Sequence, residues 1–232
     1  MPEGTYLISG SLSLSAKQSL VGAGQTAVIK TVNDSFAAIS VAASQTSIRN
    51  IRIEGGSIGV KYMGGTNECT QNSLSDVIIF AADIGIQLDG GESSTYPCYW
   101  NNFDRILIEQ PGVHGVHLTL SGAGDTPNAN RFHMVRVYSK GAMTSGSGFY
   151  VEHGSFNNAF MDCEANVNGA SADSCFRLGG GSNKTLIMNL LCESNNLVPN
   201  VQLDDGSIET SILNLSAESN GAAIYDNSGG AY

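Results

Sequence analysis

The segments Ile51-Arg52-Ile53-Glu54, Val77-Ile78-Ile79-Phe80 and Ile106-Leu107-Ile108-Glu109 are three copies of one pattern. Each is a short apolar strand that leads through a turn into a second short strand and then a Gly-rich corner. Four more copies follow in segments 135–149, 161–176, 190–201 and 215–224. The steps between equivalent strand residues are 26, 29, 29, 26, 29 and 25 for the aligned set Ile53, Ile79, Ile108, Val137, Cys163, Cys192 and Ala217. Such a period predicts a solenoid, in which each unit buries its apolar face only against its neighbours.

Short strands separated by corners, without a helical period, favour the parallel β-helix among solenoids. We therefore predict an all-β, single-stranded parallel β-helix with about 25–29 residues per coil. It occupies residues 1–232 as one domain, with less regular first coils at 1–44 and seven regular coils at 45–232. Residues one repeat apart then lie one rung apart, roughly 4.8 Å. Asn-rich corners open the later coils, and their side chains can hydrogen-bond the turn of the adjacent rung; they are Asn101-Asn102, Asn128 and Asn130, Asn157-Asn158, and Asn183.

The composition suits a β domain and argues against two classes of anionic partner. Hydrophobic residues make up 41% of the chain, enough for a core, and the 28 Gly suit tight corners. The net charge of −10 argues against nucleic acid or insertion into a membrane with anionic lipids. No apolar run approaches the roughly 20 residues of a membrane span. An acidic polysaccharide stays open as a partner, because local basic residues can contact one.

The chain has five cysteines, so at least one thiol is unpaired. Cys163 and Cys192 take inward positions of consecutive repeats, where Cys packs as a small hydrophobic residue. Buried unpaired thiols indicate assembly in a reducing cytosol, even if the finished particle works outside the cell.

Strand side chains alternate between core and solvent, so the inward residues define outward columns. The first predicted outward column consists of Glu54, Phe80, Glu109, Tyr138, Glu164, Glu193 and Glu218. The second column, two residues earlier, consists of Arg52, Ile78, Leu107, Arg136, Asp162, Leu191 and Ser216. A Glu-x-Asn unit is then stacked three times, with its amides at Asn166, Asn195 and Asn220.

The stacked carboxylates suggest catalysis, because an outward strand position does not require glutamate. Adjacent rungs would place two carboxylates roughly 5 Å apart, and the pair Asp162/Glu164 would be about 6–7 Å apart. These separations bracket those of retaining and inverting glycosidases. Three alternatives stay open: a solvated Glu copied by duplication, a structural Asn ladder, and a divalent cation between the carboxylates, for which no EF-hand-like spacing exists.

Outward apolar residues suggest a partner surface. Ile78, Leu107 and Leu191, with Phe80 beside them, are apolar where water is expected. Such a face indicates contact with another chain or an inserted loop, and a symmetric homo-oligomer is the simplest partner. The four histidines are interpreted as surface or corner residues. No Ser-His-Asp elbow, P-loop or zinc spacing is present, so no metal site is predicted.

The N-terminal segment resembles the first coils of a known superfamily. Segment 2–10 (PEGTYLISG), followed by the Gly-x-Gly turn of segment 20–24 (LVGAG), looks like the opening of pectate-lyase-like β-helix proteins, and among these bacteriophage tailspikes and capsular depolymerases. The resemblance implies a right-handed parallel β-helix, a homotrimer, a place on the virion tail outside the cell after assembly in the bacterial cytoplasm, and cleavage of a bacterial surface polysaccharide. The sequence shows no recognisable particle-binding head or trimerising end domain, which predicts an isolated β-helix region or a small relative.

Three functions follow as hypotheses. The first is a glycoside hydrolase that cleaves a capsule, exopolysaccharide or O-antigen without a cofactor. Its catalytic carboxylates would be Glu164 and Glu193, with Asp162, Glu109 and Glu218 as alternates, and its substrate would contact Tyr138, Arg136, Asn166 and Asn195. The second is a polysaccharide lyase, in which Arg136 or a cation such as Ca²⁺ neutralises a uronic acid. The third is a non-catalytic fibre that binds a glycan receptor.

Overall fold

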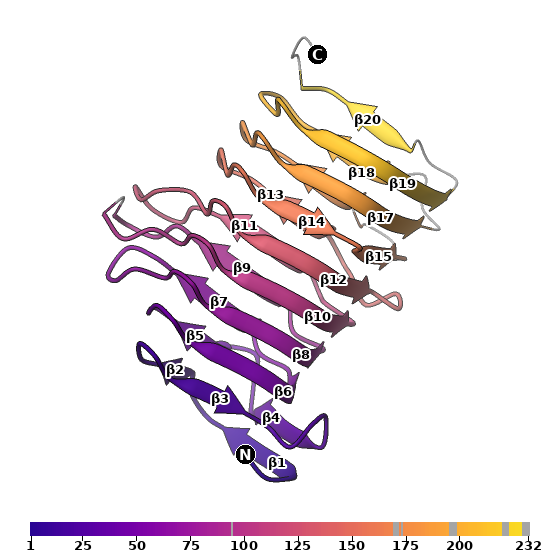
Figure 1. The fold of residues 1–232 in the computed structure, drawn as a ribbon. Helices are drawn as coiled ribbons and strands as arrows, with labels where there is room; N and C mark the ends of the chain where they lie inside the picture. Colours follow the sequence, from indigo (N-terminus) through magenta and orange to yellow (C-terminus); the bar gives the residue numbers. More distant parts are fainter. Residues whose placement is uncertain (94, 169–171, 173, 195–198, 220–222, 229–232) are drawn as a thin grey trace.

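The computed structural model describes residues 1–93, 95–168, 172, 174–194, 199–219 and 223–228. Every regular element in this part of the chain is a β-strand, and the strands stack as parallel coils of a β-solenoid (Figure 1). The fold class is therefore confirmed.

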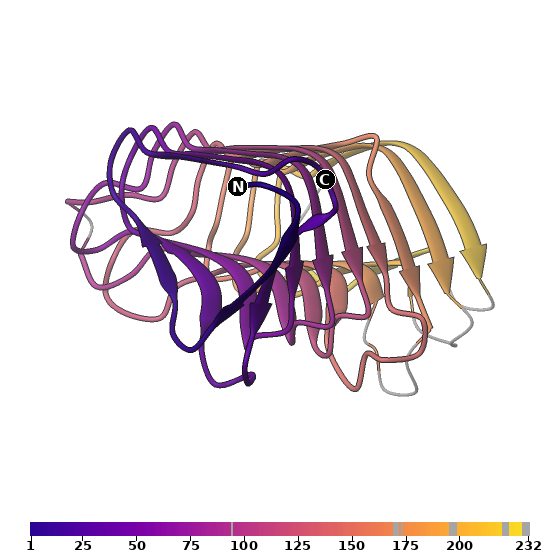
Figure 2. The same cartoon turned by 90° about the horizontal axis from the view of Figure 1, so that it is seen from below.

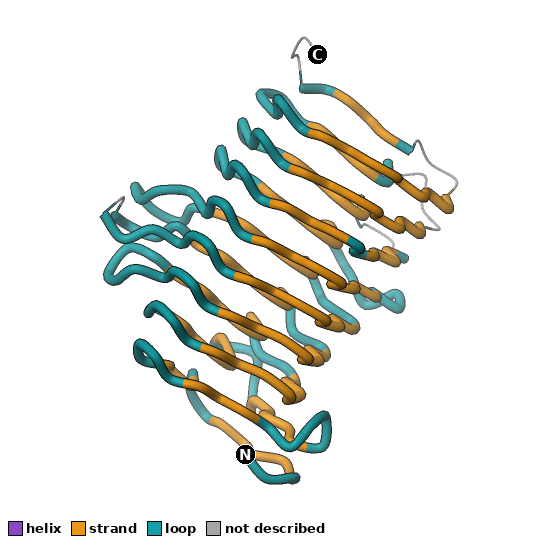
Figure 3. Tube along the Cα trace, viewed as in Figure 1, coloured by secondary structure: helices purple, strands orange, loops and turns teal. Residues whose placement is uncertain are grey.

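The coils form two long parallel sheets. The eleven-stranded sheet, here sheet A, contains β1 (Gly4–Ile8), β3 (Ser19–Val21), β4 (Ala27–Thr31), β6 (Ser47–Glu54), β8 (Ser73–Phe80), β10 (Asn102–Glu109), β12 (Arg131–Tyr138), β14 (Ala159–Met161), β15 (Glu164–Val167), β17 (Leu186–Ser194) and β19 (Ser211–Ser219). The nine-stranded sheet, here sheet B, contains β2 (Leu12–Leu14), β5 (Ala37–Val41), β7 (Ile58–Met63), β9 (Ile84–Asp89), β11 (His114–Thr119), β13 (Ser147–Val151), β16 (Ser174–Leu178), β18 (Val201–Leu203) and β20 (Ile224–Asp226). Seen from below, the coils lie one behind another (Figure 2), and loops join the strands at the edges (Figure 3).

Two corners per coil have a left-handed backbone at residues other than glycine. The first precedes each long strand of sheet A, with φ between 51° and 61° at Gln45, Gln71, Trp100, Ala129, Asn157, Lys184 and Glu209. The second lies inside the strand, with φ between 51° and 55° at Asn50, Asp76, Arg105, Met134, Asp162, Asn189 and Asn214. L-residues enter this region at a steric cost, so the stacked rungs must hold each corner in place.

The core lies between the two sheets and consists of stacked inward side chains. The rings of Phe103, Phe132 and Phe160 are stacked on successive rungs with centroids 4.6 Å apart, and all are at most 1% exposed. All five cysteines are buried free thiols. This confirms that Cys163 and Cys192 face inward.

A ladder of buried asparagines supports the first corner. The backbone N–H groups of Asn72, Asn101 and Asn130 donate to the side-chain oxygens of Asn101, Asn130 and Asn158, respectively, each at 3.0 Å. The amide nitrogen of Asn101 in turn donates to the Cys69 carbonyl at 3.0 Å. The predicted role of the corner asparagines is confirmed for Asn101, Asn130 and Asn158, and the ladder also includes Asn72.

In the N-terminal coils, β1 pairs with β4, and both β3 and β4 pair with β6. The turn at the predicted Gly-x-Gly site crosses closely over β6. A Cβ atom at Gly22 would lie only 2.2 Å from the Asn50 carbonyl oxygen, and Gly24 has φ +106°. Glycine is therefore required for the close approach at Gly22 and for the backbone conformation at Gly24.

The predicted register is wrong in one coil. Val137 pairs with Ala165, and Ala165 with Cys192, so Ala165 takes the place predicted for Cys163. The corner at Asp162 resets the alternation of side chains, and the spacing of Met161 and Cys163 across it imitates an inward strand pair. Met161 is instead partly exposed, and the true steps in this region are 28 and 27 residues.

Candidate functional site

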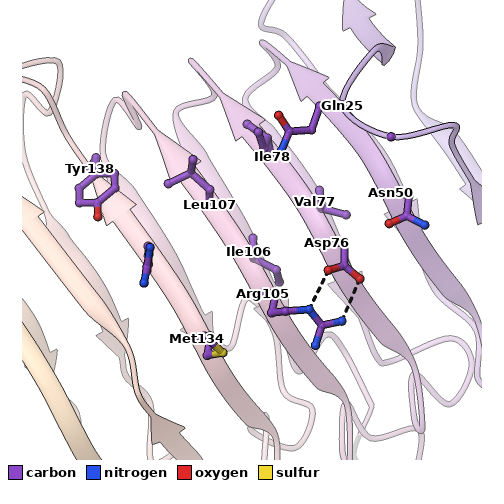
Figure 4. Close-up of a pocket in the computed structure, with 12 residues that line it drawn as sticks. Gln25, Asn50, Asp76, Val77, Ile78, Arg105, Ile106, Leu107, Met134 and Tyr138 are labelled. Atoms are coloured by element: carbon purple, nitrogen blue, oxygen red, sulfur yellow. Dashed lines mark hydrogen bonds and ion pairs between the residues drawn. The ribbon is translucent and has the colours of Figure 1, made fainter. Parts of the chain in front are cut away.

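A groove runs across the outer face of sheet A. It has a volume of about 500 Å³ and extends over β6, β8, β10 and β12, from Gln25 to Tyr138 (Figure 4). The predicted outward apolar residues Ile78 and Leu107 line it, and Ile78 is only 8% exposed. Arg105 lies at one edge and contacts the Asp76 carboxylate through two nitrogens at 2.7 and 2.9 Å.

Two side chains at the end of the groove, Tyr138 and Arg136, contact a carboxylate on the next rung. The hydroxyl of Tyr138 donates a hydrogen bond to Glu164 at 2.7 Å, and the guanidinium Nε of Arg136 lies 3.5 Å from the same carboxylate. Burial and the bond to Glu164 raise the pKa of Tyr138 to about 12, so the phenol keeps its proton at neutral pH. Glu164 is 17% exposed, whereas the Arg136 side chain is 53% exposed and free to reach a ligand.

Glu193 lies diagonally from Glu164, two positions further along the strand on the next rung. The register shift places Leu191 beside Glu164, and places Glu193 between Asn166 and Glu218. The amide of Asn166 donates to the Glu193 carboxylate. The stacked Glu-x-Asn ladder predicted from the sequence is therefore wrong at Glu164, because one rung is displaced by two residues.

This displacement changes the expected distance between the two carboxylates. One rung and two strand residues separate the Cα atoms of Glu164 and Glu193 by about 8 Å. A pair stacked on adjacent rungs, as predicted, would be roughly 5 Å apart. The Cα atoms of the displaced pair are therefore farther apart than those of a stacked pair.

The structure separates two alternate catalytic residues from this pair. Asp162 was predicted in the outward column beside Glu164, but it lies at the left-handed corner. There it contacts His133 at 3.3 Å and accepts a hydrogen bond from Asn189 at 2.8 Å. Glu109 lies one rung before Tyr138, as predicted, and forms an ion pair with Lys140.

Of the two remaining predicted site residues, Glu218 is described by the structure and Asn195 is not. Glu218 is exposed and lies beside Glu193 on the next rung, so it extends the acidic surface. Asn195 lies outside the described residues, and so does Asn220.

Among the described residues, no group of three or more His, Cys, Asp or Glu side chains is arranged to hold a metal ion. In the same residues, no helix is long and apolar enough to cross a membrane.

A second polar cluster, not predicted from the sequence, lies on sheet B. The Glu152 carboxylate accepts hydrogen bonds from Thr119 at 2.6 Å and from the Nε2 atom of His117 at 2.8 Å. The hydroxyl of Tyr150 bonds the same carboxylate, and the Tyr150 ring is parallel to His117, with centroids 5.2 Å apart. The Nδ1 atom of His117 is buried without a hydrogen-bond partner. His117 lies in strand β11 and not at a corner, and its side chain is partly buried between its neighbours on the sheet surface.

The second cluster extends to a neighbouring histidine and an ion pair. His114 accepts the Ser147 N–H at its Nδ1 atom, at 3.0 Å, and burial lowers its pKa to about 4. Arg177 lies over the Tyr150 ring and contacts Asp204 at 2.7 Å. In sequence these residues are far apart, and only the rung register, which aligns His117 with Tyr150 and Arg177, brings them together.

Comparison with known proteins supports the fold. No family model matches the sequence, and no curated protein matches it. Among solved structures, ORF18 of Geobacillus virus E2 is similar, with a TM-score of 0.65, 14% identity, and coverage of 97% of this chain and 51% of that chain. The catalytic domain of a GH87 α-1,3-glucanase in complex with nigerose is also similar, with a TM-score of 0.55, 13% identity, and coverage of 97% and 60%. The chain thus spans about half to three fifths of these proteins, and the likeness shows a shared β-helix fold.

Proposed function

We propose that the protein is a glycoside hydrolase that cleaves a bacterial surface polysaccharide at the outer face of sheet A. The observation that carries this proposal is that the groove reaches Tyr138 and Arg136, which contact Glu164, and that the Cα atom of Glu193 lies about 8 Å from that of Glu164 across one rung. The groove is long and open, as a chain-like substrate requires. The likenesses to a viral protein and to a glucanase domain fit a phage depolymerase, and a homotrimer on a virion tail belongs to the same proposal.

In this proposal each carboxyl group has its own role. Glu164 accepts the proton of Tyr138 in a hydrogen bond and faces Arg136, so it acts as the carboxylate that takes a proton from water. The resulting hydroxide attacks the anomeric carbon, and the bond to the leaving oxygen breaks. Glu193 donates the proton that this oxygen needs. Because water enters opposite the leaving group, the reaction inverts the anomeric configuration.

The test is cleavage of a panel of capsular, exopolysaccharide and O-antigen polymers, followed as new reducing ends. We expect Glu164→Gln and Glu193→Gln each to lower the rate by about 10²–10⁴-fold, and nuclear magnetic resonance to show inverted product. Glu54→Gln is the matched control, because Glu54 is also an outward glutamate of sheet A held by arginine, at 2.7 Å from Arg52. Full activity in both glutamine variants, or loss in the control alone, contradicts the assignment.

A second candidate, a polysaccharide lyase, is favoured by the sheet B cluster. His117, oriented by Glu152, and Tyr150 are proton-transfer groups, and Arg177 beside them can neutralise a uronic acid. In that case the products absorb ultraviolet light, His117→Gln removes cleavage, and the sheet A variants keep it. The same experiment therefore separates the two reactions. Glycan binding without any product would favour a receptor-binding fibre.

A further inference from the structure

A second depression lies at the first corner of sheet A and shares no lining residue with the groove. Its volume is about 550 Å³, within the range of small-molecule sites. The corner residues of four successive rungs cross it, namely Trp100, Ala129, Asn157 and Lys184. Three rung steps span about 14 Å, which is room for several sugar units. The small side chains of Ala129 and Ala159 leave the space between Trp100 and Lys184 open.

Trp100 is an unusual residue for this position. Its φ of 56° is left-handed, a conformation that is rare for a bulky residue, and the neighbouring corners have the smaller or more flexible Gln71 and Ala129. Trp100 is 58% exposed, although Tyr99 supports its ring edge-on at 5.9 Å. A large flat apolar side chain thus faces solvent at some cost to the backbone, which indicates a ligand rather than a packing role.

The chemistry around Trp100 is cationic and rich in amides. Arg131 is exposed, and its guanidinium has no hydrogen-bond or ion-pair partner among the described residues. Lys184 is also exposed, and its only described contact is with the exposed Glu209, at 3.7 Å. The exposed amides of Asn102 and Asn157 lie in the same depression. In a chain with a net charge of −10, two available cations beside an indole are a local exception.

We propose that this depression binds an acidic oligosaccharide, separately from the hydrolysis proposed for sheet A. The indole of Trp100 packs against the apolar face of a sugar ring, and the guanidinium of Arg131 pairs with a carboxylate in a bidentate manner. Lys184 contacts a second acidic unit, while the two amides bond hydroxyl groups. Single-stranded nucleic acid also combines rings with negative charge, so an oligonucleotide is the competing ligand in the test below.

Intrinsic fluorescence tests this proposal directly, because Trp100 is the only tryptophan of the chain. The full chain with Glu164→Gln and Glu193→Gln, which keeps ligands intact, is titrated with oligomers of galacturonate and of glucuronate. We expect a saturable change in emission for at least one of them, and binding weakened roughly tenfold by Arg131→Gln or Lys184→Gln. Lys30→Gln is the control, because Lys30 is an equally exposed lysine on the distant strand β4. It should leave the affinity unchanged.

Three results would overturn the proposal. The first is no saturable change with either acidic oligomer. The second is equal affinity for the carboxyl-reduced, neutral forms of the same oligomers, which would remove the role of the cations. The third is tighter binding of a single-stranded oligothymidylate. The fluorescence titration does not depend on turnover. Absence of binding at Trp100 would therefore not contradict the hydrolase proposal, and absence of hydrolysis would not contradict binding at Trp100.

Discussion

At the scale of single residues, Glu152 connects pH with stability. Burial raises the pKa of its carboxyl group, but hydrogen bonds from His117, Thr119 and Tyr150 outweigh burial and hold the pKa at about 2. Because this value lies below the ordinary value of 4.5, the carboxylate stabilises the folded state above pH 4.5, and the contribution is lost as the pH falls toward 2. Between pH 6 and pH 3 the loss amounts to about 2 kcal/mol.

Urea unfolding at the two pH values checks this. In Glu152→Gln the free energy of unfolding should fall by about 2 kcal/mol less between pH 6 and pH 3 than in the unmodified chain. Glu209→Gln, at an exposed glutamate, serves as the control and should keep the full dependence. The same pH dependence in Glu152→Gln and in the unmodified chain would show that the hydrogen bonds to Glu152 do not favour its ionised form.

Single residues were also where the sequence was least informative. The outward positions of Tyr138, Arg136 and Glu193 follow from alternation, and the structure has them there. Glu164 also faces outward, but it lies beside Arg136 instead of Tyr138, because the left-handed corner at Asp162 shifts the register by two residues. Five of the seven residues at this corner are Asn or Asp, which enter the left-handed region most readily, but Arg105 and Met134 take the same place, so residue type alone does not mark the corner. Asp162 lies between Met161 and Cys163, which look like an inward strand pair in the sequence, so the corner that sets the register was not recognised there.

At the scale of structural elements, the asparagine ladder is the feature that holds successive corners together. Asn101 is fully buried and has hydrogen bonds with Asn72, Asn130 and the Cys69 carbonyl, whereas its neighbour Asn102 is exposed. Replacing Asn101 by alanine removes the partner of the Asn72 N–H and of the Cys69 carbonyl in the preceding rung, whereas the backbone N–H of residue 101 still donates to Asn130. We expect a loss of about 3 kcal/mol in the free energy of unfolding, measured by chemical denaturation.

Asn102→Ala gives the matched comparison, because the two residues are adjacent and chemically identical. We expect a change within about 0.5 kcal/mol for this exposed residue. Equal losses in both variants would mean that the asparagine doublet acts through backbone propensity rather than through the ladder. The sequence predicted this element well, since Asn recurs with the coil period and an inward amide at a corner has few other partners.

At the scale of the whole molecule, the repeat made the architecture predictable. Apolar alternation, Gly-rich corners and a period of 25–29 residues together exclude most other folds. The two long parallel sheets confirm the predicted β-helix. The sheet B cluster was not predictable in the same way. Its members, His117, Tyr150, Glu152 and Arg177, are of different chemical types on different rungs. A repeat search finds similar residues at equivalent positions, whereas a functional cluster requires dissimilar ones.

The stacking of coils also predicts how the molecule unfolds. In a solenoid each coil contacts only its neighbours, so a core defect should weaken the adjacent rungs most. Phe132 is stacked between Phe103 and Phe160, and Phe132→Ala removes both contacts, at a cost of about 3–5 kcal/mol. Hydrogen exchange read by mass spectrometry should then show the largest loss of protection in β10, β12 and β14, and a smaller loss in β6. Phe156→Ala, at a phenylalanine that is 36% exposed in the next coil, should leave protection nearly unchanged. An equal loss in every strand would show that the solenoid unfolds as one cooperative unit, and coupling between neighbouring coils would then exceed the stability of any one coil.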